Sequence, residues 1–412
     1  MIKMTSKRLK DKKVPNLRFP GFEEEWKTKK LGDLLEFKNG INATKEQYGN
    51  GYKFINVLDI LSNEFITYDK IIGSVNVTNE IINKFPVNYG DILFQRSSET
   101  REEVGTTSVY LDKHKTATFG GFVIRGKQIG EYEPIFLNKA LKTSFVRNQI
   151  TSKSGGSTRY NVGQEILASV TLSLPSIIEQ QKIASFLSLI DERITTQNKI
   201  IEYQETLMLG VLTKIFTQKL KSNSIRTKEF PLWTYKKGGD IFYNCSNKKH
   251  NSDLPILAIT QEYGAVPRDL IDHNITVTEK SIDSYKVVDK GDFIISLRSF
   301  QGGIEYSNYH GICSPAYIIL KNSIDIVPEF YKHYLKSAAY IKLLNKKLEG
   351  IRDGKMISYN YFSEINLPYP CLEEQKYIAD ILTTIDNKIK IEKQMLNSLS
   401  KQRDYLLQQM FI

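Results

Sequence analysis

Two halves of the amino-acid sequence carry the same series of motifs, and this duplication limits the possible folds more than any other feature. Residues 179–191, EQQKIASFLSLID, recur as residues 374–386, EQKYIADILTTID. The copies lie 195 residues apart, since 374 − 179 = 195. Because solenoid repeats are only about 20–50 residues long, we predict instead a duplicated domain in which each copy ends in a long helix.

Further matches extend the repeat over most of each half. An apolar alternation ending in proline precedes both segments, as VTLSLP at 170–175 and INLPYP at 365–370. Farther upstream, YGDILFQRS at 89–97 matches KGDFIISLRS at 290–299. The openings of the two copies also correspond, since Phe-Pro is followed by Trp26 in one and by Trp233 in the other.

The first part of each copy reads as a mixed α/β domain. Short β-like runs are broken by turn residues, and one helix is expected in each copy, at about 134–150 and 328–348. The expected strands are 52–57, 91–94 and 121–125 in the first copy, and 255–259, 292–296 and 316–320 in the second.

After each proline-ended strand, apolar residues recur at heptad spacing over five heptads, which is typical of a coiled coil. We expect the seam to consist of Ile183, Leu187, Ile190, Ile194, Ile201 and Met208 in the first helix, and of Ile378, Leu382, Ile385, Ile389, Leu396 and Leu399 in the second.

An amphipathic helix lying on its own domain is the alternative interpretation of this pattern. A helix of about 40 residues extends about 60 Å, which is longer than a domain of this size covers. We therefore expect the two helices to pack on each other in antiparallel orientation, with one globule at each end. The polar Gln197, Gln204, Glu392 and Arg403 interrupt the seam and could fix its register. The expected fold class is α+β, with two α/β domains joined by an antiparallel coiled coil in a pseudo-twofold internal repeat.

Composition narrows the function less than the repeat does. The 57 Lys and Arg outnumber the 46 Asp and Glu, giving a net charge of +11 that suits a polyanion or an acidic partner. Three scattered cysteines and five histidines without ligand spacing predict neither a disulfide framework nor a metal site. Because no run of about 18 apolar residues exists, we expect a protein of the cytoplasm without a membrane segment.

Catalytic motifs are not expected in this chain. Residues 121–127, GFVIRGK, have the spacing of a phosphate-binding loop, but Gln128 stands where the metal-binding Ser or Thr is needed. The sequence also lacks a dinucleotide-binding glycine motif, a methyltransferase loop, a nucleophile elbow and a zinc-protease helix. Two large domains without an active site favour a recognition protein.

Two loops in each copy have the composition of a nucleic-acid contact, since Arg, Lys, Ser and Thr bind phosphates and base edges. A surface turn with a solvated arginine is the plainer interpretation of any single loop. The same composition at matched places in both copies brings the two interpretations close to balance. The candidate DNA-binding residues are Arg96, Ser97, Arg101, Lys153, Ser157, Thr158, Arg159 and Tyr160 in the first copy, and Arg298, Ser299, Gln301, Arg352 and Lys355 in the second.

Taken together, these segments resemble the specificity subunits of type I restriction–modification systems. The resemblance lies in the opening PNLRFPGF at 15–22 with Trp26, in the Gly-Asp strand followed by Arg-Ser, and in the EQQKIA helix start. It covers essentially the whole chain. The second copy departs mildly, because its opening is compressed and EQKY replaces EQQK.

The resemblance implies a division of labour along the chain. Residues 1–175 and 221–370 would be target-recognition domains that each read one half of a bipartite site in double-stranded DNA. Helices 176–220 and 371–412 would set the spacer and dock two modification (methyltransferase) subunits. Those subunits would use S-adenosylmethionine, and restriction subunits (translocase/endonuclease) would use ATP and Mg, whereas this chain would bind no cofactor and perform no catalysis. The alternatives are a coiled-coil scaffold with two protein-binding globules and, less favoured, an enzyme in its own right.

Overall fold

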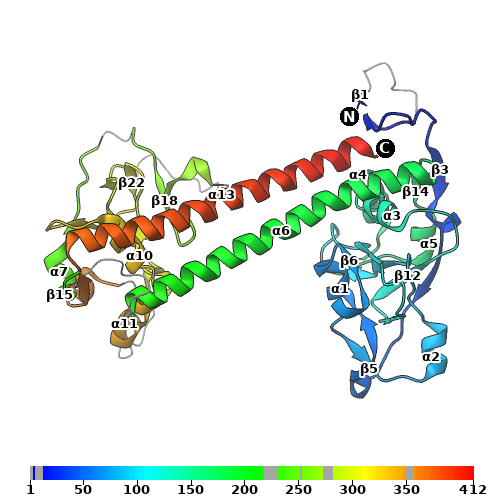
Figure 1. Cartoon of the computed structure of the whole chain (residues 1–412), viewed down its shortest axis with the longest axis horizontal. Helices are drawn as coiled ribbons and strands as arrows, with labels where there is room; N and C mark the ends of the chain where they lie inside the picture. Colours follow the sequence, from blue (N-terminus) through cyan, green and yellow to red (C-terminus); the bar gives the residue numbers. More distant parts are fainter. Residues whose placement is uncertain are drawn as a thin grey trace. The chain divides into compact units, whose positions relative to one another are not determined.

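The structure, a computed structural model, describes residues 3–4, 13–156, 158–217, 230–250, 253–271, 282–348 and 357–412. The chain divides into two compact units. Unit 1 comprises Met1–Thr196 with Met395–Ile412, and unit 2 comprises Gln197–Gln394. Each unit therefore contains one β-rich domain together with parts of two long helices (Figure 1).

The central sheet of unit 1 has five strands in the order β4-β12-β8-β10-β6. Strand β8 (Ile92–Gln95) is buried along its whole length, as expected for a strand inside a sheet. The other strands of this sheet are β4 (Leu35–Asn39), β12 (Val123–Gln128), β10 (Thr107–Tyr110) and β6 (Phe65–Ile66). A smaller sheet contains β11 (Thr118–Phe119), β5 (Tyr48–Ile55) and β7 (Ser74–Val75).

Besides the helical region at 134–153, the described part of unit 1 has three strand pairs and three short α-helices. The pair β3 (Lys27–Lys30) and β14 (Thr171–Leu174) joins the opening of the copy to its proline-ended strand. The remaining pairs are β1 (Lys3–Met4) with β2 (Leu17–Arg18) and β9 (Ser97–Ser98) with β13 (Tyr160–Asn161). The short helices are α1 (Val57–Ser62), α2 (Asn79–Lys84) and α5 (Gln164–Ala168).

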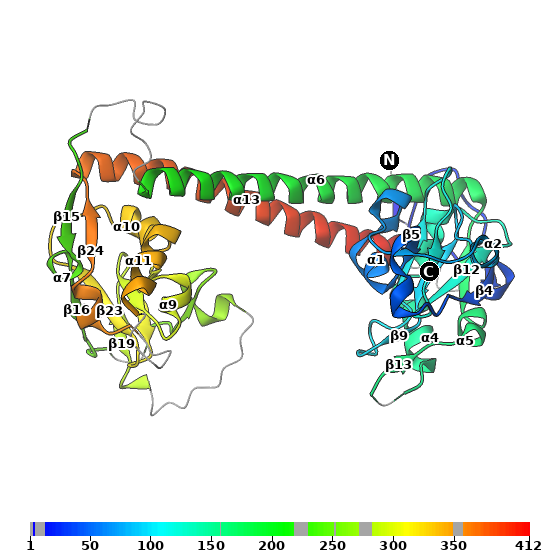
Figure 2. The same cartoon turned by 90° about the horizontal axis from the view of Figure 1, so that it is seen from below.

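Unit 2 repeats the central sheet in the order β16-β23-β20-β21, which corresponds to β4-β12-β8-β10 of unit 1. Its strands are β16 (Phe242–Cys245), β23 (Ile318–Asn322), β20 (Phe293–Ile295) and β21 (Glu305–Tyr306). The pair β15 (Thr234–Lys237) and β24 (Asn366–Tyr369), side by side in Figure 2, matches β3 and β14. The other elements are β17 (Leu257–Thr260), β18 (Gly264–Pro267), β19 (Lys286–Val288), β22 (Gly311–Cys313), α7 (Gly238–Ile241), α9 (Ser299–Gly302) and α12 (Tyr359–Ser363). The common strand order confirms the duplication inferred from the sequence.

The prediction of a single helix within each domain is wrong, because in both domains this region forms two helices separated by a break at the equivalent place. Unit 1 has α3 (Pro134–Ala140) and α4 (Ser144–Lys153), and unit 2 has α10 (Pro328–Tyr334) and α11 (Ala338–Leu348). In the first break the Thr143 hydroxyl donates to the Ala140 carbonyl, and in the second the Ser337 hydroxyl donates to the Tyr334 carbonyl. A hydroxyl that bonds to a carbonyl three residues earlier offers the backbone an alternative to continued helix.

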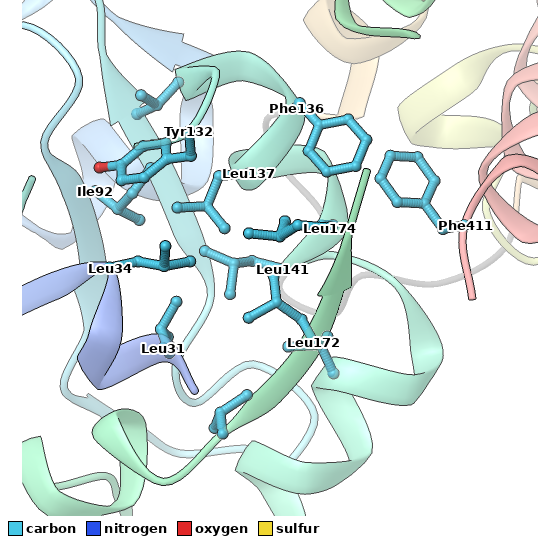
Figure 3. Close-up of a cluster of buried hydrophobic side chains, with 14 of the residues drawn as sticks. Leu31, Leu34, Ile92, Tyr132, Phe136, Leu137, Leu141, Leu172, Leu174 and Phe411 are labelled. Atoms are coloured by element: carbon cyan, nitrogen blue, oxygen red, sulfur yellow. The ribbon is translucent and has the colours of Figure 1, made fainter. Parts of the chain in front are cut away.

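The core of unit 1 includes the end of the chain (Figure 3). The ring of Phe411 lies 5.0 Å from that of Phe136, measured between centroids, and 6.3 Å from that of Trp26. Leu137 and Leu174 are buried in the same cluster. Because aromatic pairs at this separation bury large apolar surfaces, the last turn of the second long helix is an integral part of unit 1.

The two long helices, α6 (Ile177–Phe216) and α13 (Leu372–Met410), pack on each other in antiparallel orientation within each unit. In unit 1 the start of α6 shares a core with the end of α13, through Ile183, Leu187, Leu406 and Met410. In unit 2 the end of α6 shares a core with the start of α13. All twelve predicted seam residues are buried or half-buried, as a seam requires. Both helices also contact the domain cores at their ends. The alternative interpretation, an amphipathic helix lying on its own domain, therefore describes part of their packing.

Within the described residues, no helix is both long and apolar enough to cross a membrane. Cys245, Cys313 and Cys371 are free thiols.

Candidate nucleic-acid interface

The two candidate loops of the first copy lie on one surface of unit 1 (Figure 2). Strand β9 of the first loop pairs with β13 of the second, placing Ser97 opposite Asn161 and Ser98 opposite Tyr160. The Val162 amide donates to the Arg96 carbonyl at 3.0 Å. The structure therefore brings together loops that are about 60 residues apart in the sequence.

Arg96 follows β8 directly and is exposed, with its backbone fixed by the turn at 120–123. Its amide donates to the Phe122 carbonyl at 2.9 Å, and its Nη1 donates to the Gly121 carbonyl at 3.2 Å. A guanidinium carries five N–H donors in a planar fork, so most of its donors are available to a ligand.

Arg101 and Lys153 help to hold the surface together. The Arg101 Nε and Nη2 donate to the carbonyls of Thr151 and Ser152, at 2.9 and 3.3 Å. These carbonyls lie in the last turn of α4, where a positive charge also complements the helix dipole. Lys153 Nζ donates to the Ser169 hydroxyl at 3.1 Å. Both side chains are exposed, yet these hydrogen bonds serve the fold of the loops.

The described residues near the tip of the second loop are open to solvent. Thr158 and Arg159 are exposed, and Arg159 Nη2 lies 4.0 Å from Glu99 Oε1. Tyr160 is half-buried against the core of unit 1. Ser157 lies outside the described residues.

Arg147 is bonded to the backbone of the first loop, and the sequence analysis did not include it among the candidate residues. Its Nη2 donates to the carbonyls of Glu102 and Val104, both at 2.7 Å. Burial lowers the pKa of this guanidinium. The contact joins residues more than 40 positions apart, so no local sequence signal could reveal it.

In unit 2, only the first of the two candidate loops lies within the described residues. Arg298 and Gln301 are exposed at α9, and the Arg298 carbonyl accepts a hydrogen bond from Gln261 Nε2 at 3.3 Å. Ser299 is 1% exposed, and its hydroxyl accepts from the Ser296 amide at 2.8 Å, so this side chain shapes the turn from inside. Arg352 and Lys355 lie outside the described residues.

The Gly-Asp motif before each of these turns has a structural role. Asp91 Oδ2 accepts from the Asn88 amide at 2.9 Å, and Asp292 Oδ2 accepts from the Asp289 amide at 2.8 Å. Burial raises the pKa of both carboxyls. Each aspartate closes the turn that leads into the central strand and thereby positions the arginine after it.

The repeated helix-start motif attaches each long helix to its own domain. Gln180 Oε1 accepts from the Glu133 amide and its Nε2 donates to the Pro175 carbonyl, both at 3.0 Å. Gln375 forms the same two bonds, with the Val327 amide at 3.0 Å and the Pro370 carbonyl at 2.9 Å. A buried amide whose oxygen and nitrogen are both bonded fixes one relative position of helix and domain.

Charged pairs reinforce this attachment on each domain. Lys139, which is 2% exposed, forms ion pairs with Glu64 and with Asp191 of α6. In unit 2, Lys332 Nζ lies 2.7 Å from the carboxylate of Asp386 in α13. Asp191 and Asp386 are the last residues of the repeated motif, so its length is explained by contacts of the helix with the domain.

Comparisons with known proteins agree with this duplicated architecture. The model of the type I restriction modification DNA specificity domain matches residues 23–203 and again residues 231–401. The putative type I restriction enzyme MjaX specificity subunit of Methanocaldococcus jannaschii is 26% identical over 407 residues, covering 93% of this chain and 92% of that protein. The MjaVIII specificity subunit of the same organism is 25% identical over 423 residues, covering 96% and 93%.

A solved structure shares the fold. The S subunit of a type I restriction–modification system from M. genitalium superposes with a TM-score of 0.61 at 20% identity, covering 97% of this chain and 99% of the other. Because the family model matches twice and spans most of the sequence, the chain belongs to the family of type I restriction–modification DNA specificity subunits.

Proposed function

We propose that this non-catalytic specificity subunit reads a bipartite DNA sequence, one half with each β-rich domain. The observation that carries the proposal is the pair of exposed arginines, Arg96 and Arg298. Each follows an equivalent central strand, and a buried Gly-Asp turn leads into that strand. An arginine fork can bind phosphate oxygens or the edge of guanine. Residues 1–175 and 221–370 would be the two recognition domains.

The long helices would set the distance between the two half-sites. A helix of 40 residues, such as α6, is about 60 Å long. Half-sites read from one side of a duplex lie roughly 34 Å apart or more, one helical turn. The buried seam and the two glutamine attachments resist bending of each helix at its domain, which is what a fixed spacer requires.

The partners would be two modification subunits, docked along the helices and using S-adenosylmethionine to methylate DNA. Apolar side chains remain exposed on α6 at helical spacing, with Ile200, Tyr203 and Leu207 at 37%, 71% and 45% exposure. Such a stripe suits a protein partner. Restriction subunits using ATP and Mg would complete a complex in the cytoplasm.

Methyl transfer to DNA tests this function. The full-length chain is incubated with DNA and a labelled methyl donor, alone and with a modification subunit. The proposal predicts labelling only in the mixture, and dependence on DNA sequence. Labelling by the chain alone would indicate an enzyme, and a mixture indifferent to DNA would indicate a protein scaffold.

A further inference from the structure

An apolar hollow of about 460 Å³ opens on unit 1 beside the candidate interface. It lies between β5, the start of α1 and the turn at 120–123. Three apolar side chains at its rim are exposed to solvent, Ile72 at 88%, Leu58 at 68% and Phe122 at 65%. Single exposed apolar residues are common, but three around one hollow mark a binding surface.

Arg96 is bonded to the turn that lines the hollow. Its amide and its guanidinium donate to the backbone carbonyls of Phe122 and Gly121, two of the lining residues. A ligand that reaches Phe122 therefore also meets a positive charge with free donors. This combination favours a ligand that is both anionic and locally apolar.

The turn that carries Phe122 is held by close packing. A Cβ at Gly121 would lie 1.9 Å from Asn42 Oδ1, and one at Gly120 would lie 2.8 Å from the ring of Phe54. Phe54 is 4% exposed and is one of the residues that line the hollow. Because side chains at these glycines would displace the turn, the position of Phe122 depends on them.

The side-chain oxygen of Asn56, a lining residue, already accepts a hydrogen bond within the protein. Asn56 Oδ1 accepts from the Leu58 amide at 2.9 Å and caps α1. The rim therefore offers mainly methyl, methylene and ring carbons to a ligand. In the major groove of DNA the 5-methyl of thymine is the apolar group at a base edge, and phenylalanine is among the side chains that contact it.

We propose that the exposed apolar side chains at the edge of this hollow contact the 5-methyl group of a thymine in the half-site read by the first recognition domain, while Arg96 contacts the neighbouring base pair or phosphate. The inference rests on the proposed function and adds Phe122, Ile72 and Leu58 as determinants of sequence specificity.

Replacing thymine by uracil tests the proposal, because uracil pairs as thymine does and lacks only the methyl. The full-length chain first selects its sequence from a randomised duplex library. Each thymine of the selected sequence is then replaced singly, and affinities are measured for the wild type, Phe122→Ala and the control Phe145→Ala. Phe145 is 52% exposed and does not line the hollow.

At one thymine, uracil is expected to weaken binding by the wild type and by Phe145→Ala about four-fold, the value of one buried methyl. The same replacement should leave Phe122→Ala unchanged. A uracil effect that persists in Phe122→Ala, or no effect at any thymine, would overturn the proposal. A library that yields no preferred sequence would instead contradict the proposed function.

Discussion

The side chain of Gln197 donates two hydrogen bonds from Nε2 to Glu392, one to the backbone carbonyl at 3.1 Å and one to Oε2 at 2.5 Å. The two positions are equivalent in the repeat, since 392 − 197 = 195, the offset of the duplicated motif. In an antiparallel helix pair, equivalent residues face each other only at the local twofold axis. The contact thus marks the centre of the helix pair and sets its register.

Removing this polar contact should destabilise the helix pair. Gln197 is 5% exposed, and Gln197→Leu leaves the half-buried Glu392 carboxylate without its donor. A loss of about 1–3 kcal/mol in the free energy of unfolding is expected from urea titration. Lys199→Ala, at an exposed position of the same helix, should change it by less than about 0.5 kcal/mol. A Gln197→Leu, Glu392→Leu double variant less stable than the single one would refute the register role.

Arg18 and Glu179 form a buried ion pair that ties the opening of the first copy to α6. Arg18 Nε and Nη2 donate to Glu179 Oε1 and Oε2 at 2.7 and 2.8 Å, and the side chains are 7% and 1% exposed. Arg18→Met should cost about 3–5 kcal/mol, because an unpaired carboxylate stays buried. The exposed pair Lys237–Glu364 is the matched control, and Lys237→Met should cost far less, because solvent screens an ion pair at the surface. Equal losses in thermal unfolding would contradict this difference.

Arg96→Ala and Arg298→Ala should each weaken specific DNA binding by about 1–3 kcal/mol if the forks contact bases. Lys127→Ala, exposed on β12, should leave affinity nearly unchanged. Fluorescence anisotropy with specific and scrambled duplexes measures both effects. Unchanged affinity in both arginine variants would show that other loops read the DNA.

Specific binding should also fall steeply with salt. Each neutralised phosphate contributes about 0.9 to the slope of log K against log salt concentration. A variant that loses a phosphate contact should reduce this slope by about one, whereas loss of a base contact should leave it unchanged. Titrations of Arg96→Ala and the wild type over a range of salt concentrations distinguish the two roles. A slope near zero for the wild type would rule out a phosphate-based interface.

His333 should make the protein less stable in mild acid. Burial, together with the neighbouring Lys332, lowers its pKa to about 4, against the opposite effect of Asp386. The unfolded chain, with a histidine pKa near 6.5, therefore binds the proton first as pH falls. Stability should decrease between pH 6.5 and about 4, by up to about 3 kcal/mol, and this component should level off below. His333→Gln should flatten the pH profile over that window, while His114→Gln, at an exposed position, should keep it.

Periodicity and repetition predicted the elements that depend on local pattern. Heptad spacing identified the twelve seam residues, from Ile183 to Leu399, as side chains that the structure buries or half-buries. Composition identified Arg96 and Arg298 as exposed side chains after equivalent strands. The pattern also grouped Ser299 with them, although its hydroxyl is bonded inside the turn.

Contacts between distant residues were not accessible to that reasoning. Glu179 lies 161 positions from Arg18, and the helix-start motif gives no indication of its partner. The helix break after Ala140 involves the hydroxyl of Thr143, and the spacing of apolar residues carries no information about that hydrogen bond. The hollow beside Phe122 is lined by residues of the separate stretches 48–58, 72–74 and 120–123, and within the sequence its glycines resemble a phosphate-binding loop.

Sequencing the methylated adenines in DNA from cells that carry this chain with its modification subunit tests the account most directly. The account predicts a motif of two short specified blocks separated by an unspecified spacer of fixed length, with only the second block relaxed by Arg298→Ala. A single uninterrupted motif, or methylation that ignores sequence, would contradict it.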